Sequence, residues 1–194
     1  GYALMSYFGK INYSFAERYL VSATVRYDGS SRFGKNNRFG TFPAFSLGWR
    51  LSEEAFIKDN TDVISDLKLR FGWGQTGNQE IDNYATYNIY TTDYGIGDPT
   101  WGAVLGTAYN ITGKGTGTLL SGFKMNQRGN DNLKWETTTQ TNIGLDFGLF
   151  NQSLYGSAEY YMKKTKDILV KPPYLAAIGE GGNRWINGAS MENW

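Results

Sequence analysis

The sequence predicts an all-β fold: a transmembrane antiparallel β-barrel, present in part, with about six strands and long extracellular loops. Three observations predict it. Apolar and polar residues alternate with a period of two, over stretches that reach the ~9–11 residues a strand needs to cross a bilayer. Connections are short at one end of the expected sheet and long at the other. Aromatic residues gather at strand ends, where an amphipathic ring suits the lipid headgroup level.

Composition excludes several classes of function. The chain has 194 residues, with 19 Lys and Arg against 18 Asp and Glu, so its net charge of +1 excludes a polybasic nucleic-acid binder. It has no Cys and no His, which excludes disulfides, thiol chemistry and a nucleophile activated by His. A mean hydropathy of −0.46 argues against membrane-spanning helices, but a membrane barrel has strands that are apolar on one face only. We therefore expect no enzymatic activity, no cofactor and no metal.

The first three strands are predicted near 7–15, 19–28 and 41–51, and the stretch 19–28 alternates most cleanly. A tight turn at 15–18 joins the first two strands, and a polar loop, 29–38, follows the second. After the third strand, residues 52–56 resemble a helical turn with Ser52 as its N-cap, because acidic residues follow it at once.

The other three strands are predicted near 66–77, 133–149 and 154–164, with a tight turn at 150–153 between the last two. Two long loops are predicted at 78–132 and 164–194. The first of them is too long for a structureless connection in a compact soluble domain. Within it, residues 84–94 are expected to pair as one arm of a hairpin.

Alternation assigns side chains to the two faces of the expected wall. The residues predicted to face lipid include Val21, Ala23, Val25, Leu69, Phe71 and Leu145. The charged residues predicted to face the lumen are Arg26, Arg50, Lys68, Arg70, Glu136 and Glu159. These charges favour two interpretations equally, a charged lumen wall or cross-strand ion pairs that hold the sheet together.

Loop aromatics are the candidates for substrate or partner contact. They are Tyr94, Trp101, Tyr109, Tyr174 and Trp185. Exposed rings can stack on sugars or on partner side chains, although loops of this size also need aromatic anchors of their own. Residues 72–77 match the G-x-G-x-x-G pattern of dinucleotide sites, but no helical segment follows them, so glycines in a strand and turn explain them better.

Several segments together resemble one known family in order and spacing. They are 19–34 (YLVSATVRYDGSSRFG), 40–56 (GTFPAFSLGWRLSEEAF), 64–70 (ISDLKLR), 74–78 (GQTGN), 133–138 (LKWETT), 166–169 (KDIL) and 187–194 (NGASMENW). They resemble the SusC/RagA-type TonB-dependent outer-membrane transporters. The last segment is similar to the approach to the next barrel strand in that family.

The resemblance implies a location in the outer membrane of a Bacteroidetes-type bacterium, and active import of a nutrient, either an oligosaccharide or a peptide. It implies a SusD-like surface lipoprotein as a partner, and energy from a TonB complex acting through an N-terminal part that is missing here. It also implies a lumen closed by a plug domain, which we expect before Gly1, with further strands after Trp194.

Two alternatives stay open on the sequence alone. One is a soluble or cell-surface β-sandwich that binds glycans through loop aromatics. The other is a passive porin or an adhesin barrel without a plug. About six strands are too few to close a barrel by themselves, since the smallest bacterial barrels have about eight.

Overall fold

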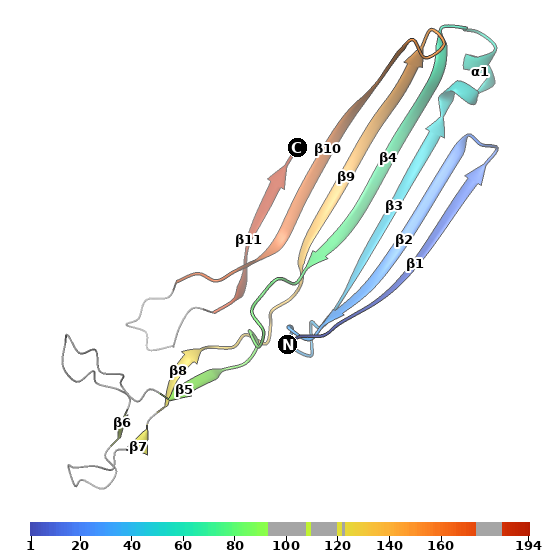
Figure 1. The fold of residues 1–194 in the computed structure, drawn as a ribbon. Helices are drawn as coiled ribbons and strands as arrows, with labels where there is room; N and C mark the ends of the chain where they lie inside the picture. Colours follow the sequence, from blue (N-terminus) through green and yellow to red (C-terminus); the bar gives the residue numbers. More distant parts are fainter. Residues whose placement is uncertain (93–107, 110–119, 122, 174–183) are drawn as a thin grey trace.

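The computed structural model describes residues 1–92, 108–109, 120–121, 123–173 and 184–194, and they form one long curved sheet with loops gathered at one end (Figure 1). The sheet has seven strands in the order β1-β2-β3-β4-β9-β10-β11. They are β1 (Leu4–Phe15), β2 (Tyr19–Ser30), β3 (Phe39–Arg50), β4 (Ile64–Asn78), β9 (Glu136–Leu149), β10 (Leu154–Val170) and β11 (Ile186–Asn193). Every neighbouring pair is antiparallel, which confirms the all-β antiparallel fold class.

Two further hairpins extend from the loop end of the sheet. Strand β5 (Ile89–Thr92) pairs with β8 (Phe123–Gln127), and β6 (Ala108–Tyr109) pairs with β7 (Leu120–Ser121). The stretch predicted as one loop, 78–132, therefore contains four short strands, and β5 lies inside the hairpin arm expected at 84–94.

The segment 164–194 is not one long loop, so that prediction is wrong. Strand β10 continues through Val170, and β11 pairs with the C-terminal half of β10. The approach to a further strand was expected at 187–194, yet this segment is already paired. Residues 186–193 show almost no alternation of apolar and polar residues, so periodicity could not predict this strand. Backbone pairing to β10 holds β11 in the sheet.

Smaller corrections concern strand and helix ends. The strand predicted at 133–149 begins only at Glu136, since Leu133 and Trp135 turn into a buried cluster instead. After β3, a 3₁₀ turn (Leu51–Glu53) and the short helix α1 (Ala55–Lys58) confirm a helical turn. Ser52 is not its N-cap, because its hydroxyl donates instead to Asp66 across the connection.

Tight turns close the opposite end of the sheet from the loops, where α1 also lies (Figure 1). The N–H of Arg18 donates to Phe15, and the N–H of Ser153 donates to Phe150, at 3.1 Å in each turn. Ala16 and Glu17 in the first turn have positive φ, as do Phe150, Asn151 and Gln152 in the second. These residues accept the left-handed conformation because the flanking strands fix the ends of each turn.

The register places the two kinds of side chain on opposite faces. Val21 pairs with Leu47, Leu47 with Phe71 and Phe71 with Ile143, so one apolar row crosses four strands. All six residues predicted to face lipid lie on this face, because directly paired residues of antiparallel strands share a face. Their contact with lipid stays a prediction. Large side chains of this face are exposed in the sheet as it stands, and a soluble monomer rarely exposes an apolar surface of this extent.

A seam divides the sheet at its loop end. Strands β3 and β4 pair only from Ala44–Gly74 to Arg50–Lys68, whereas β3 stays paired to β2, and β4 to β9, beyond that point. Pro43, the next residue, has no N–H to donate, which suits the place where a ladder ends. The ring of Phe42 occupies the position that a Cβ would take on Gly77, so a buried aromatic side chain fills the seam in place of backbone hydrogen bonds.

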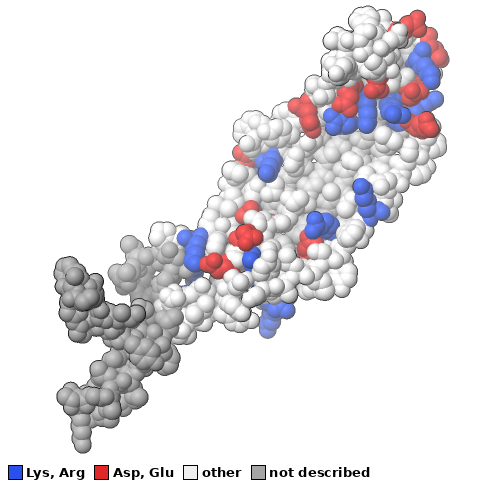
Figure 2. All heavy atoms as spheres, in the orientation of Figure 1, with Lys and Arg blue, Asp and Glu red and all other residues white. Residues whose placement is uncertain are grey.

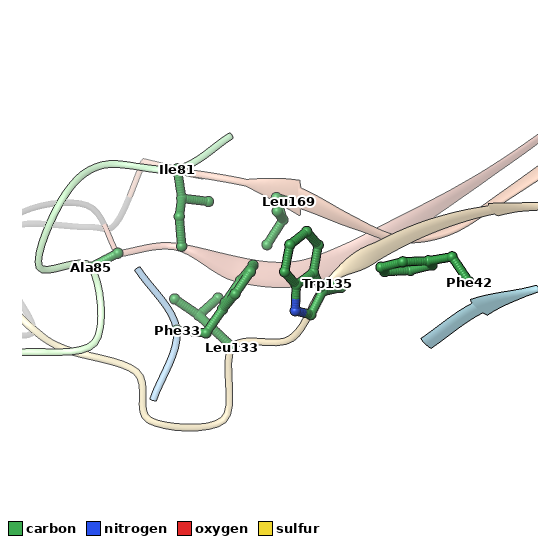
Figure 3. Packing of buried hydrophobic residues seen from close by; sticks show 7 residues of the cluster. All are labelled: Phe33, Phe42, Ile81, Ala85, Leu133, Trp135 and Leu169. Atoms are coloured by element: carbon green, nitrogen blue, oxygen red, sulfur yellow. The ribbon is translucent and has the colours of Figure 1, made fainter. Parts of the chain in front are cut away.

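The buried core lies at this seam and under the loops, not between two sheets (Figure 3). Its members are Phe33, Phe42, Ile81, Ala85, Leu133, Trp135 and Leu169, which we call the loop-base cluster. They come from five separated segments of the chain, so the cluster ties the loops to one another and to the strand ends.

Candidate functional site

The polar face of the sheet carries a row of charged side chains near the turn end. Figure 2 shows acidic and basic side chains gathered at the end of the molecule that carries α1. The guanidinium of Arg70 holds Asp146 through two hydrogen bonds of 2.8 and 2.9 Å. It lies flat over Gly144, where a Cβ would approach its Nη2 to 3.0 Å, so the glycine makes room for the pair. Glu159, on the next strand, accepts a hydrogen bond from Asn142.

Four of the six charges predicted for the lumen have partners within the sheet. Besides Arg70 and Glu159, Arg26 pairs with Asp28 at 3.0 Å. Glu136 accepts hydrogen bonds from the Leu169 N–H at 3.1 Å and from the side chain of Asn78 at 3.3 Å. Cross-strand pairing therefore applies to Arg70, Glu136 and Glu159. Arg26 and Asp28 lie on the same strand, and a charged lumen wall stays a prediction.

Arg50 and Lys68 differ from these four. They are direct cross-strand partners on the same face, and neither has an ion pair or hydrogen bond from its side chain among the described residues. A groove of about 360 Å³ runs beside Lys68 on this face. Its lining includes Lys68, Arg70, Asn142 and Glu159 above three glycines, Gly48, Gly72 and Gly144.

At the loop end, Arg32 connects three loop segments. Its guanidinium donates to Glu80 at 3.0 Å, to the Gln79 carbonyl at 3.3 Å and to Asn83 at 3.3 Å. It also lies over the ring of Tyr2, 3.9 Å from its centre. Because Arg32 is buried and makes three hydrogen bonds and an ion pair within the loops, it fixes the loop base.

Trp185 is the one predicted contact residue whose side chain the structure describes. It packs against the loop-base cluster, and its indole N–H donates to Asp82 at 2.9 Å. Lys171 donates to the same carboxylate at 2.6 Å. These hydrogen bonds lower the pKa of Asp82, the one from Lys171 most. Trp185 thus anchors the loops, and any contact with a ligand stays a prediction.

The other predicted contact residues yield no site geometry. Tyr94, Trp101 and Tyr174 lie outside the described residues, and for Tyr109 only the backbone, in β6, is described. Sequence reasoning did not select Tyr84, Tyr87 and Tyr90, three exposed aromatics on the path into β5. The rings of Tyr84 and Tyr87 meet edge to face at 6.4 Å, and Gln127 donates to the backbone carbonyl of each of these two residues. Their exposure followed from burial of Ala85 and Thr86 between them, which no local pattern indicates.

The turn end has a polar cluster of its own around Glu54. Its carboxylate accepts hydrogen bonds from the Tyr19 hydroxyl at 2.7 Å, the Trp49 indole at 3.0 Å and Arg18 at 3.2 Å. These donors lower the pKa of Glu54, the Tyr19 hydroxyl most. The cluster fastens the β3–β4 connection to the β1–β2 turn and orients two aromatic rings at the level where a headgroup region would lie.

Within the described ranges, no group of three or more acidic side chains could hold a metal ion. The helices found there are also too short to cross a membrane. The chemistry of the site is thus that of charged and aromatic surfaces on a β-sheet.

Comparison with known proteins decides the family. All of residues 1–194 match the family model described as TonB dependent receptor-like, beta-barrel. The chain belongs to this family of TonB-dependent receptor barrels. It is 42% identical over 201 residues to the TonB-dependent receptor SusC of Bacteroides thetaiotaomicron, covering 98% of this chain and 18% of SusC. It is 37% identical over 192 residues to the TonB-dependent receptor P39 of Formosa agariphila, covering 99% of this chain and 16% of P39.

Two solved structures agree with the fold. The RagAB peptide transporter superposes with a TM-score of 0.76 and 31% identity, covering 98% of this chain and 19% of that one. The siderophore receptor PirA of Pseudomonas aeruginosa superposes with a TM-score of 0.55 at 16% identity, which shows the fold alone. The chain thus spans under a fifth of the length of SusC, P39 and RagAB.

Family membership settles the fold and the location. The seven strands are part of a β-barrel wall in a bacterial outer membrane, and the β-sandwich alternative is wrong. The predicted relation to SusC and RagA is confirmed, and the Bacteroides and Formosa relatives fit the Bacteroidetes-type source that the resemblance implies. SusC and P39 are TonB-dependent receptors, and RagAB is a peptide transporter.

Proposed function

We propose that this chain is part of the wall of a TonB-dependent importer that moves an oligosaccharide or a peptide across the outer membrane. The observation that carries the proposal is the 42% identity to SusC over 98% of the chain. The superposition on the RagAB peptide transporter supports it independently. In this proposal the apolar face contacts lipid, the polar face lines the lumen, and the loop end takes part in capturing cargo.

The dimensions of the apolar face support this assignment. On β2 the outward row runs from Tyr19 to Tyr27, a separation of eight residue steps or about 26 Å along the strand. At a strand tilt of about 40°, that is about 20 Å of height, close to the apolar band of roughly 25 Å on outer-membrane barrels. Aromatic residues close both ends of the row, as interfacial girdles would.

We also propose two partners, a SusD-like surface lipoprotein and a TonB complex. The lipoprotein would contact the loop end, where the loop-base cluster holds five segments in place. The TonB complex would act through a part of the protein outside residues 1–194, including a plug domain. The SusC and RagAB relatives support both partners. SusC is called a TonB-dependent receptor, and the name RagAB joins two components, A and B.

Uptake by living cells tests the proposal. A strain that lacks the parent gene should lose uptake of one class of fluorescently labelled oligosaccharide or peptide, and a strain without TonB should lose the same uptake. Purification of the parent protein from membranes should recover a surface lipoprotein in equal amount. Uptake that persists without TonB would favour the passive porin alternative.

A further inference from the structure

We propose that Arg50 and Lys68 form an anion seat on the polar face, which binds a carboxylate from a segment of the same polypeptide outside residues 1–194. This inference rests on the proposed function, because only then is the polar face the wall of a filled lumen. The side chains of Arg50 and Lys68 together make up this anion seat.

Arg50 and Lys68 place two positive charges side by side on the polar face. Arg50 and Lys68 stand directly opposite each other on neighbouring strands, and like charges in such a pair destabilise a sheet. Asp146 is the direct partner of Lys68 on its other side, yet Arg70 takes both oxygens of that carboxylate. The planar guanidinium fits a carboxylate with two bonds, which a lysine cannot match, so Lys68 is left without a partner.

The other nearby carboxylates also have partners. Glu53, whose pKa is lowered chiefly by Lys58, pairs with that lysine at 3.0 Å. Glu159 accepts the amide of Asn142, and Asp66 accepts the hydroxyl of Ser52. Arg50 also contributes, less than Lys58, to the lowered pKa of Glu53, yet neither Arg50 nor Lys68 has a salt bridge or a side-chain hydrogen bond among the described residues. Charge complementarity assigns an anion to this place.

The polar face has room for an anion beside Lys68. The groove beside Lys68 has a volume of about 360 Å³ and lies above three glycines, which keep side chains out of it. The stem of Lys68 lies against Gly48, where a Cβ would meet its Cε at 3.5 Å. A side chain that reaches the wall from the lumen can thus enter the groove and place its carboxylate at Lys68, whose direct cross-strand partner is Arg50.

A segment of the same polypeptide is the proposed source of the carboxylate. This chain spans only 18% of SusC, so most of the polypeptide lies outside the described sheet. A segment of the same polypeptide is present at a high effective concentration near the wall, which a dilute cargo molecule is not. A permanent pair of like charges in the wall is best explained by an equally permanent anion.

The sign of a stability change tests the seat in the full-length protein. Lys68→Met removes the charge and keeps most of the stem. If a carboxylate occupies the seat, the midpoint of thermal unfolding should fall, since the anion loses one partner. If the seat is empty, the same change relieves repulsion, and a midpoint that rises or stays unchanged overturns the proposal. Lys10→Met is the matched control, because Lys10 also lies on the polar face but opposite Thr24.

Cross-linking identifies the occupant. A photoreactive amino acid replaces Lys68 in the full-length protein in outer membranes, and mass spectrometry identifies the attached peptide. We expect a peptide of the same chain, outside residues 1–194, with an Asp or Glu at or next to the attachment point. Replacing that acid by Lys should restore the midpoint in a Lys68→Glu background. Attachment to added cargo, to lipid or to nothing overturns the proposal.

Failure of the seat and failure of the proposed function are distinguishable. Uptake that still depends on TonB, together with no cross-link to the same chain, removes the anion seat and leaves the importer. Loss of TonB dependence removes the importer whatever the cross-link shows.

Discussion

Single residues on β4 illustrate how the two faces differ. Leu69 and Phe71 join the exposed apolar row, whereas Lys68 and Arg70 alternate with them on the polar side. One backbone thus presents a surface for lipid and a surface for ions, and a shift of one residue in register would exchange them. Substitution of neighbouring residues should therefore have very different effects.

Ala23 and Thr24 provide the sharpest comparison. Ala23 lies midway along the outward row of β2, and Thr24 is on the opposite face. In the full-length protein, Ala23→Arg should lower the free energy of unfolding by about 2–4 kcal/mol, the cost of an arginine at the bilayer midplane. Thr24→Arg should cost clearly less. Urea unfolding in lipid vesicles measures both, and equal costs would contradict the face assignment.

Asp82 predicts a pH response in the loops. Because its pKa is lowered in the folded chain, the stabilisation is present above the unfolded value, about 3.9, and is lost as pH falls through the folded pKa. A ¹⁹F signal from 5-fluoro-Trp185 should therefore shift below about pH 4. Asp82→Asn should abolish this titration. Asp167→Asn, which removes a carboxylate paired only with Lys134, should leave it in place.

Between the strands, the seam is the place where side chains replace the ladder. The Trp135 indole N–H donates to the Arg38 carbonyl at 3.3 Å, and the rings of Trp135 and Phe42 meet edge to face at 5.4 Å. Phe42 is only 5% exposed, so the two halves of the sheet depend on this contact at the loop end.

Phe42→Ala should open the seam. The loss of a buried phenylalanine is expected to cost about 3–5 kcal/mol, because it leaves a cavity that the paired strands cannot close. Hydrogen exchange should accelerate in residues 39–43 and 75–78 and stay unchanged in 44–50. Phe45→Ala, on the exposed face of the same strand, is the control. Uniform acceleration along β3 would show that the ladder, and not the cluster, holds this end.

Alternation predicted the strands well because a wall with two unlike faces must show a period of two. The same reasoning failed where that constraint is absent. Strand β11 is held by backbone pairing, and its outward Glu192 pairs with Lys164 and not with an apolar neighbour. The loop-base cluster joins residues from Phe33 to Leu169, and no local pattern indicates contacts over that separation. Arg50 and Lys68 lie on the polar face as alternation predicted, but the lack of a partner for Lys68 depends on the preference of Asp146 for Arg70.

Across the whole sheet, the outer strands β1 and β11 each have one unpaired edge among the described residues. In lipid, an open edge costs several kcal/mol for each unsatisfied backbone group, so in the proposed importer each of these edges would pair with a further strand.

Residues 1–194 alone should consequently fail to insert into membranes. Seven strands are fewer than the roughly eight of the smallest closed bacterial barrels. Refolded in detergent, the segment should aggregate and show no heat-modifiable band on electrophoresis, whereas the full-length protein should show one. A monomeric, heat-modifiable segment would mean that the sheet closes on itself.

The length of β4 also determines how far the wall extends past its apolar row. Its last outward apolar residue is Trp73, and the strand continues for five residues to Asn78, with Gln75 outward beyond that ring. Five residues rise about 17 Å along a strand, or about 13 Å of height at a tilt near 40°. The wall therefore continues past its apolar row and carries the loop-base cluster beyond the end of that row. In the proposed importer, cargo capture at the loops then takes place away from the lipid-facing surface.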